Sequence, residues 1–234
     1  MSLYFSFTPD LIVEATSVCD RACSGCYAPN VVSTQSMHIL YTERPDLFLS
    51  PHMTAIVLSK FESSLQLISI RGGEPTRHPE LAKLISLCGQ IAATVVVETH
   101  GRWLLPENVA SNSELLKAVK TAGATIKLSF DRMHGLRSQQ LKIITDFLNE
   151  NRIRYLVAIT ELDETQFMNS RRECSWIPND QIIFQQKTNS NESLSNPPCG
   201  VLNVRGQTVK NLNVKKEFGS NRLPLPQEVR RLSI

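Results

Sequence analysis

Hydrophobic residues in this chain gather in six short runs, and each run is followed by a polar or glycine-containing turn. From the second run onward the starts recur every 26 to 31 residues. This spacing is typical of repeated strand–helix units, which form a parallel sheet. The predicted strands are residues 11–16, 65–70, 94–99, 125–131, 155–160 and 181–186.

Between these strands, apolar residues recur three and four positions apart, which is the pattern of amphipathic helices. Pro79 is expected to open one helix, a Ser111–Glu114 capping box the next, and Ser138 a third. A further helix is expected over residues 54–62, before the second strand. The helix after Pro79 has the clearest apolar stripe, made of Leu81, Leu84, Ile85 and Cys88.

Six strands are fewer than the eight of a complete barrel, which takes about 250 residues. The chain has 234 residues. An α/β fold is therefore expected, with a partial six-stranded (βα)6 TIM-like barrel over residues 1–186. In parallel barrels the functional groups sit at the carboxyl ends of the strands, so a site is expected in the loops that follow the strands.

Residues 187–234 differ in composition and are expected to form a basic C-terminal extension. They contain eight Lys or Arg and three Glu. Two apolar runs on either side of Arg205-Gly206 predict a small hairpin. Such an extension would cover the open edge of the sheet; docking to an acidic partner is the alternative.

Composition and charge exclude some classes of function. A net charge of +3 with 41% hydrophobic residues gives no electrostatic case for a nucleic-acid partner. No apolar stretch reaches the ~20 residues of a membrane span, and the start of the chain lacks the basic region of a secretory signal. The six cysteines then point to a reducing compartment, and a cytoplasmic location is expected.

Three cysteines follow the first predicted strand with the spacing C-x3-C-x2-C: Cys19, Cys23 and Cys26. A structural zinc ion or a closed iron–sulfur cluster takes four protein ligands. Three thiolates would leave one iron of a [4Fe–4S] cluster open, as catalytic metal sites do. The alternatives are half of a zinc site, or three core cysteines that happen to lie close together.

A second motif, Gly72-Gly73-Glu74-Pro75, follows the second predicted strand. In this order and at this distance, the two motifs resemble the radical S-adenosylmethionine (radical SAM) family, over roughly residues 11–186. Tyr27, directly after the third cysteine, is similar to the arrangement in members that modify peptides. His100 departs from the pattern, because similar proteins often have Asn at this strand end.

The resemblance implies a [4Fe–4S] cluster on Cys19, Cys23 and Cys26, with SAM at the open iron. In this family the reduced cluster cleaves SAM to a 5′-deoxyadenosyl radical, which abstracts a hydrogen atom from a substrate. An electron donor such as flavodoxin or ferredoxin is implied as well. The SAM-binding residues expected from the resemblance are Tyr27, Gly72, Gly73, Glu74, Thr99, Ser129 and Asp131.

Alternation along the fourth predicted strand supports two of these residues independently. Lys127, Ser129 and Asp131 share one face of the strand. Parallel strands are normally buried on both faces, so a polar face favours a binding site. Glu98, on the preceding strand, would need a partner if it were buried, and Lys127 is the expected one.

Two further cysteines are candidates to donate a hydrogen atom to a substrate radical: Cys174 and Cys199. The segment around Cys199 resembles the opening of the auxiliary-cluster domain in peptide-modifying members, but no further cysteine follows it. Inert thiols are therefore the alternative. His134 follows Asp131 and is a weaker candidate for contact with the substrate.

The function expected from the sequence is that of a radical SAM enzyme acting on a peptide or protein side chain. Two alternatives lie within the family: an activase that installs a glycyl radical in a partner enzyme, and an enzyme that modifies a nucleoside or sugar. A third alternative is a non-catalytic iron–sulfur binding module. Binding of zinc without any response to SAM would favour a metal-binding module.

Overall fold

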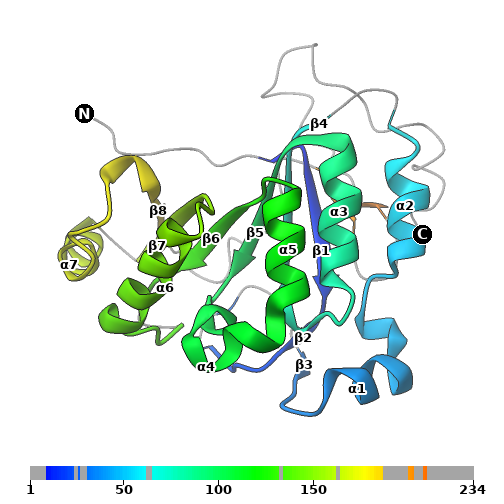
Figure 1. Cartoon of the computed structure of the whole chain (residues 1–234), viewed down its shortest axis with the longest axis horizontal. Coiled ribbons are helices and arrows are strands. Elements are labelled where there is room, and N and C mark those ends of the chain that lie inside the picture. The colour runs from blue at the N-terminus through cyan, green and yellow to red at the C-terminus, as the bar shows by residue number, and fades with distance from the viewer. Residues whose placement is uncertain are drawn as a thin grey trace.

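The computed structural model describes residues 9–23, 26, 31–61, 65–131, 134–161, 164–186, 200–202 and 208–209. Its centre is an eight-stranded sheet with the strand order β10-β9-β1-β4-β5-β6-β7-β8 (Figure 1). The six predicted strands are adjacent and parallel, which confirms the α/β class. Closure into a partial barrel stays a prediction. The bounds are β1 (Leu11–Thr16), β4 (Leu65–Gly72), β5 (Ala92–Thr99), β6 (Thr125–Ser129), β7 (Tyr155–Glu161) and β8 (Ile182–Gln186).

Helices cover one face of this sheet. In Figure 1, α3, α5 and α6 lie side by side in front of the strands. The facing strand residues Val13, Ile70, Val97 and Ile126 stand opposite one another in register and belong to the same buried cluster as the helix stripes. The helices are α1 (Met37–Glu43), α2 (Pro51–Leu58), α3 (Leu81–Ile91), α4 (Pro106–Val109), α5 (Ser113–Thr121), α6 (Ser138–Glu150) and α7 (Glu164–Glu173).

Two predicted helix caps are wrong. Ser111 lies inside the 3₁₀ turn η4 (Ala110–Asn112), which runs directly into α5, and its hydroxyl donates to the Asn108 carbonyl at 2.8 Å. Ser138 is the first residue of α6, and its hydroxyl donates to the Glu173 carbonyl. A hydroxyl can donate and accept at once, so the reason lies in position: the N-cap residue is Asn112 for α5 and Arg137 for α6.

Helix α2 begins earlier than the predicted 54–62, because Pro51 occupies its first turn. It also ends earlier, at Leu58. Helix α3 begins at Leu81, two residues after Pro79. Its predicted stripe is confirmed, since Leu81, Leu84, Ile85 and Cys88 are all buried.

The ends of β1 and β4 are joined closely at Gly72. A Cβ atom on Gly72 (φ +154°) would lie 2.3 Å from the carbonyl oxygen of Thr16, so only glycine fits there. Beyond this contact, the Gly73 N–H donates to Thr16 O at 2.7 Å and the Glu74 N–H to Val18 O at 2.9 Å. These bonds hold the turn after β4 against the start of the cysteine loop.

A short hairpin forms the edge of the sheet next to β1. Strand β9 (Gly200–Leu202) pairs parallel to β1, and β10 (Thr208–Val209) pairs antiparallel to β9. Leu202 is fully buried in the main core. The division of the chain at residue 186 stays a prediction.

A separate two-stranded ladder joins β2 (Val18–Cys19) to β3 (Val31–Val32) beside the cysteine loop. In the part of the chain that the structure describes, every helix is too short or too polar to cross a membrane.

Candidate functional site

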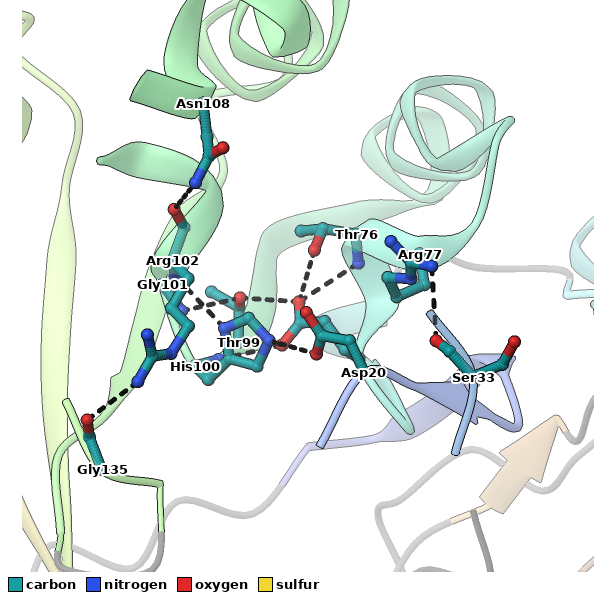
Figure 2. Close-up of polar contacts among 11 residues, drawn as sticks. Asp20, Ser33, Thr76, Arg77, Thr99, His100, Gly101, Arg102, Asn108 and Gly135 are labelled. Atoms are coloured by element: carbon teal, nitrogen blue, oxygen red, sulfur yellow. Dashed lines mark hydrogen bonds and ion pairs between the residues drawn. The ribbon is translucent and has the colours of Figure 1, made fainter. Parts of the chain in front are cut away.

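Polar residues from four strand ends meet at the carboxyl edge of the sheet. The cysteine loop follows β1, the Gly72-Gly73-Glu74 turn follows β4, Thr99 and His100 end β5, and Asp131 follows β6. Figure 2 shows Asp20, Thr76, Thr99 and His100 pointing toward one another from three of these loops. The sequence placed the motifs at strand ends, and the parallel sheet brings those ends together.

Glu74 lies at the centre of this group and is only 2% exposed. Its Oε1 accepts from the Thr76 N–H at 3.2 Å, the Thr76 hydroxyl at 2.8 Å and the Thr99 hydroxyl at 2.7 Å. Its Oε2 accepts from the His100 N–H at 3.0 Å. The carboxylate therefore caps η2 (Pro75–Arg77) and ties the end of β4 to the end of β5.

His100 links this carboxylate to the cysteine loop. The buried ring places Nε2 3.0 Å from Asp20 Oδ1 and 3.3 Å from Glu74 Oε2. The hydrogen bond from His100 holds the pKa of Asp20 below its usual value. Burial disfavours the charged imidazole, but the Glu74 and Asp20 carboxylates outweigh burial and raise the pKa of His100.

The three cysteines of the loop differ in exposure. Cys19 is buried, Cys23 is half-buried and Cys26 is exposed. Burial raises the pKa of the Cys19 thiol to about 11, and a hydrogen bond from the Arg21 backbone opposes this shift. The Cys26 N–H donates to the Cys23 carbonyl at 3.2 Å, which makes a tight turn between the second and third thiols.

A [4Fe–4S] cluster fits this donor set in kind, because three thiolates on one loop are the ligands that such a cluster takes. Among the described side chains, no three His, Cys, Asp or Glu groups lie close enough to hold a single metal ion. Tyr27, the expected adenine contact, lies outside the described residues.

Asp131 is paired within its own loop. The Nδ1 atom of His134 lies 2.8 Å from both Asp131 carboxylate oxygens, and the His134 N–H donates to Oδ1 at 2.9 Å. Asp131 is buried, whereas the His134 side chain is 28% exposed. The His134 ring is therefore more accessible to a bound molecule than the Asp131 carboxylate is. Ser129 is half-buried at the end of β6.

Arginine side chains surround the same edge. The Arg102 guanidinium donates to the Gly135 carbonyl at 2.9 Å, and the Arg77 guanidinium donates to the Ser33 carbonyl at 3.4 Å (Figure 2). A Cβ on Gly135 would lie 3.1 Å from the Arg21 guanidinium, so Arg21 and Arg102 both approach this loop. Cations at this position favour a bound anion.

A row of charges crosses the sheet on the face opposite the helices. Glu14 stands opposite Arg71, and Glu98 opposite Lys127, each one position further along its strand than the buried core row. Lys127 Nζ lies 3.0 Å from Glu98 Oε2, which confirms the expected pair. The Ser69 hydroxyl donates to the other Glu98 oxygen at 2.5 Å. Glu14 and Arg71 were not predicted as site residues, although a charge in each of two buried strands was the available signal.

Cys174 is 0% exposed and belongs to the main core. Burial raises the pKa of its thiol, and Arg171 opposes this shift. Complete burial favours the inert-thiol interpretation of Cys174. Cys199 lies outside the described residues. The roles of both as hydrogen-atom donors stay predictions.

Comparisons with known proteins find remote structural matches. No family model matches the chain, and no curated protein matches it. Among solved structures, SuiB of Streptococcus suis bound to the precursor peptide SuiA matches at 15% identity and a TM-score of 0.40, over 78% of this chain and 50% of that one. SuiB bound to S-adenosylmethionine matches at 15% identity and a TM-score of 0.42, over 94% of this chain and 63% of that one.

A third structure of SuiB matches at 14% identity and a TM-score of 0.42, over 96% of this chain and 64% of that one. This chain thus spans less than two thirds of the SuiB chains that it matches. A likeness at these TM-scores carries no conclusion about function.

Proposed function

We propose that this chain is a radical SAM enzyme in which Cys19, Cys23 and Cys26 hold a [4Fe–4S] cluster that binds SAM. The observation that carries the proposal is the meeting of the three-cysteine loop with the Gly-Gly-Glu turn at one edge of the sheet. The N–H groups of Gly73 and Glu74 bond to the backbone directly before the first cysteine. Two motifs that are distant in sequence thus form a single site.

When bound and reduced, the cluster supplies the electron that cleaves SAM to a 5′-deoxyadenosyl radical, which abstracts hydrogen from the substrate. The protein's own contribution is to hold the thiols and the cosubstrate. The Arg21 backbone N–H stabilises a thiolate at Cys19. The Thr99 hydroxyl and the His100 N–H fix the Glu74 carboxylate, so that the turn after β4 keeps one shape.

The favoured substrate is a peptide or protein side chain. Tyr27 after the third cysteine is the arrangement associated with peptide-modifying members of the family. The charge row of Glu14, Arg71, Glu98 and Lys127 suits a polar substrate of any of the candidate classes better than an apolar one. SuiB was solved with SAM and with a precursor peptide, but the likeness is too remote to support the choice.

In this proposal the six parallel strands form a partial barrel with the charge row inside. A flavodoxin or ferredoxin would supply the electrons. The cytoplasm, where thiols stay reduced, would be the compartment.

The test is SAM cleavage after anaerobic reconstitution with iron and sulfide, with dithionite as the reductant and 5′-deoxyadenosine measured by chromatography. Product is expected from the wild-type chain and not from Cys19→Ala, Cys23→Ala or Cys26→Ala. Cys88→Ala is the matched control, because Cys88 is fully buried on α3 away from the loop and its loss should leave product formation intact. A chain that binds zinc, takes up no cluster and leaves SAM intact would contradict the proposal.

A further inference from the structure

We propose that Asp20 and His100 are positioning residues that fix Cys19 to the ends of β4 and β5. The importance of this pair for a cluster rests on the proposed function. Its effect on Cys19 does not, and it can be measured in metal-free protein.

The orientation of the His100 ring is set by its backbone neighbour. The Arg102 N–H donates to His100 Nδ1 at 3.2 Å, so Nδ1 is an acceptor and the ring hydrogen lies on Nε2. From there it is donated to Asp20 Oδ1 at 3.0 Å. Because the ring is only 6% exposed, it has little freedom to turn away.

His100 is itself held by a carboxylate whose oxygens accept from other groups as well. Its N–H donates to Glu74 Oε2, while Glu74 Oε1 accepts from the Thr76 and Thr99 hydroxyls. Asp20 is therefore tied through one imidazole to a buried network spanning the ends of β4 and β5. Such a network of satisfied polar groups is rigid.

Three consecutive residues at the start of the loop each accept a hydrogen bond from a group outside residues 19–26. Val18 O accepts from Glu74 N at 2.9 Å, and Cys19 O accepts from Ser33 N at 2.9 Å. The Asp20 side chain accepts from His100. By contrast, the Cys23 carbonyl accepts from the Cys26 N–H, which is a contact within the loop itself. Of the three thiols, Cys19 is the most buried and Cys26 the most exposed.

The experiment measures alkylation of each cysteine in the metal-free, folded chain, by iodoacetamide and peptide mass spectrometry. In wild-type protein Cys19 should react much more slowly than Cys26. Asp20→Ala removes the acceptor at a side chain that is 32% exposed, so the fold should survive. It is expected to speed alkylation of Cys19 by about tenfold, the effect of losing one hydrogen bond to a charged group.

Two substitutions of His100 distinguish the roles of its two ring nitrogens. His100→Gln can still donate from its amide nitrogen to Asp20 and should keep Cys19 slow. His100→Asn can still accept from Arg102 but is too short to reach Asp20, so it should match Asp20→Ala. Cys88, which is fully buried, is the internal reference: it stays unreactive as long as the fold is intact.

Equal Cys19 rates in wild type, Asp20→Ala and His100→Asn would overturn the proposal, and so would alkylation as fast in His100→Gln as in His100→Asn. If Cys88 also reacts in the His100 variants, Asp20→Ala is compared with Asp20→Asn, which keeps an acceptor oxygen but loses the charge; equal Cys19 rates in these two variants would overturn the proposal. The proposed function can fail separately, since a wild-type chain with a protected Cys19 that takes up no iron would contradict the function and leave the positioning role standing. Conversely, full SAM cleavage with unchanged Cys19 rates in all variants would leave the function standing and remove the positioning role.

Discussion

Glu74 is a carboxylate whose oxygens already accept hydrogen bonds from the protein around it. Four donors from Thr76, Thr99 and His100 bond to its oxygens, and Glu74 is only 2% exposed. A carboxylate satisfied in this way stabilises the turn after β4 without any bound molecule. Its expected contact with SAM stays a prediction, and the structure gives it a second role that can be tested in the free chain.

Glu74→Gln should lower the free energy of unfolding by about 2 to 4 kcal/mol, because the new amide group would face backbone and hydroxyl donors that need an acceptor. Urea denaturation followed by circular dichroism measures this change. Glu107→Gln, at an exposed position of α4, is the control and should leave stability unchanged. A Glu74→Gln chain as stable as wild type would mean that the carboxylate does not hold the turn.

The Glu98–Lys127 pair makes the free energy of unfolding depend on pH. Burial disfavours the Glu98 carboxylate, but Lys127 and the Ser69 hydroxyl outweigh burial and lower the pKa of Glu98. Such a group stabilises the fold above its unfolded pKa, and the contribution is lost as the pH falls through the lower folded value. Unfolding free energy measured from pH 6 down to pH 3 should fall in the wild type and fall less in Glu98→Gln.

Glu98→Gln should also cost about 2 to 3 kcal/mol at pH 7, because it leaves the buried Lys127 ammonium without its carboxylate. The double variant Glu98→Gln, Lys127→Met removes both charges and should recover part of that loss. If the double variant were the less stable of the two, the ion pair would not be the source of the effect.

At the scale of elements, the junction of β1 and β4 depends on Gly72. Gly72→Ala combines an unfavourable backbone angle with a contact of 2.3 Å to the Thr16 carbonyl, and β1 already has an irregular register there. We expect a loss of about 3 kcal/mol or more, since backbone on both sides must shift. Thermal unfolding measures it.

Gly123→Ala is the matched comparison. Gly123 has φ +56° and only the end of the Arg154 side chain within reach of a Cβ, at 3.7 Å. Its replacement should cost only the conformational penalty, about 1 kcal/mol. Equal losses at the two glycines would mean that the approach of Thr16 is not what requires Gly72.

The strands could be predicted from the sequence because burial on both faces of a parallel strand produces apolar runs of recognisable length. Helix starts were harder to predict. Serine is a common N-cap residue, but the hydroxyls of Ser111 and Ser138 donate to carbonyl groups that could not be predicted from the sequence. The Glu98–Lys127 pair was predictable because neighbouring strands of a parallel sheet place equivalent positions side by side.

At the scale of the whole molecule, the sheet extends beyond the six predicted strands. Leu202 of β9 packs into the same core as β1 and β4 and is 0% exposed. Leu202→Ala should therefore lower the free energy of unfolding by about 2 to 4 kcal/mol and shift the whole transition. Fluorescence and far-ultraviolet circular dichroism, recorded together, would reveal a separate transition if the hairpin unfolded independently of the sheet.

Only part of the candidate site could be predicted from the sequence. The cysteine loop and the Gly-Gly-Glu turn were visible as local motifs, and their meeting followed from parallel strands. The Asp20–His100 contact could not be foreseen, because it joins side chains 80 residues apart and depends on the depth of each loop. Glu74 was identified as functional, but its network with Thr99 and His100 required coordinates.

The separation of Asp20 from His100 has a consequence for the order of events during synthesis. At about 5 to 20 residues per second, the ribosome adds His100 roughly 4 to 16 seconds after Asp20, since His100 is 80 positions further along the chain. During that interval the first cysteine has neither its histidine-held neighbour nor β5 beside it. The nascent chain therefore carries three open thiols, and only the completed sheet makes Cys19 different from the other two.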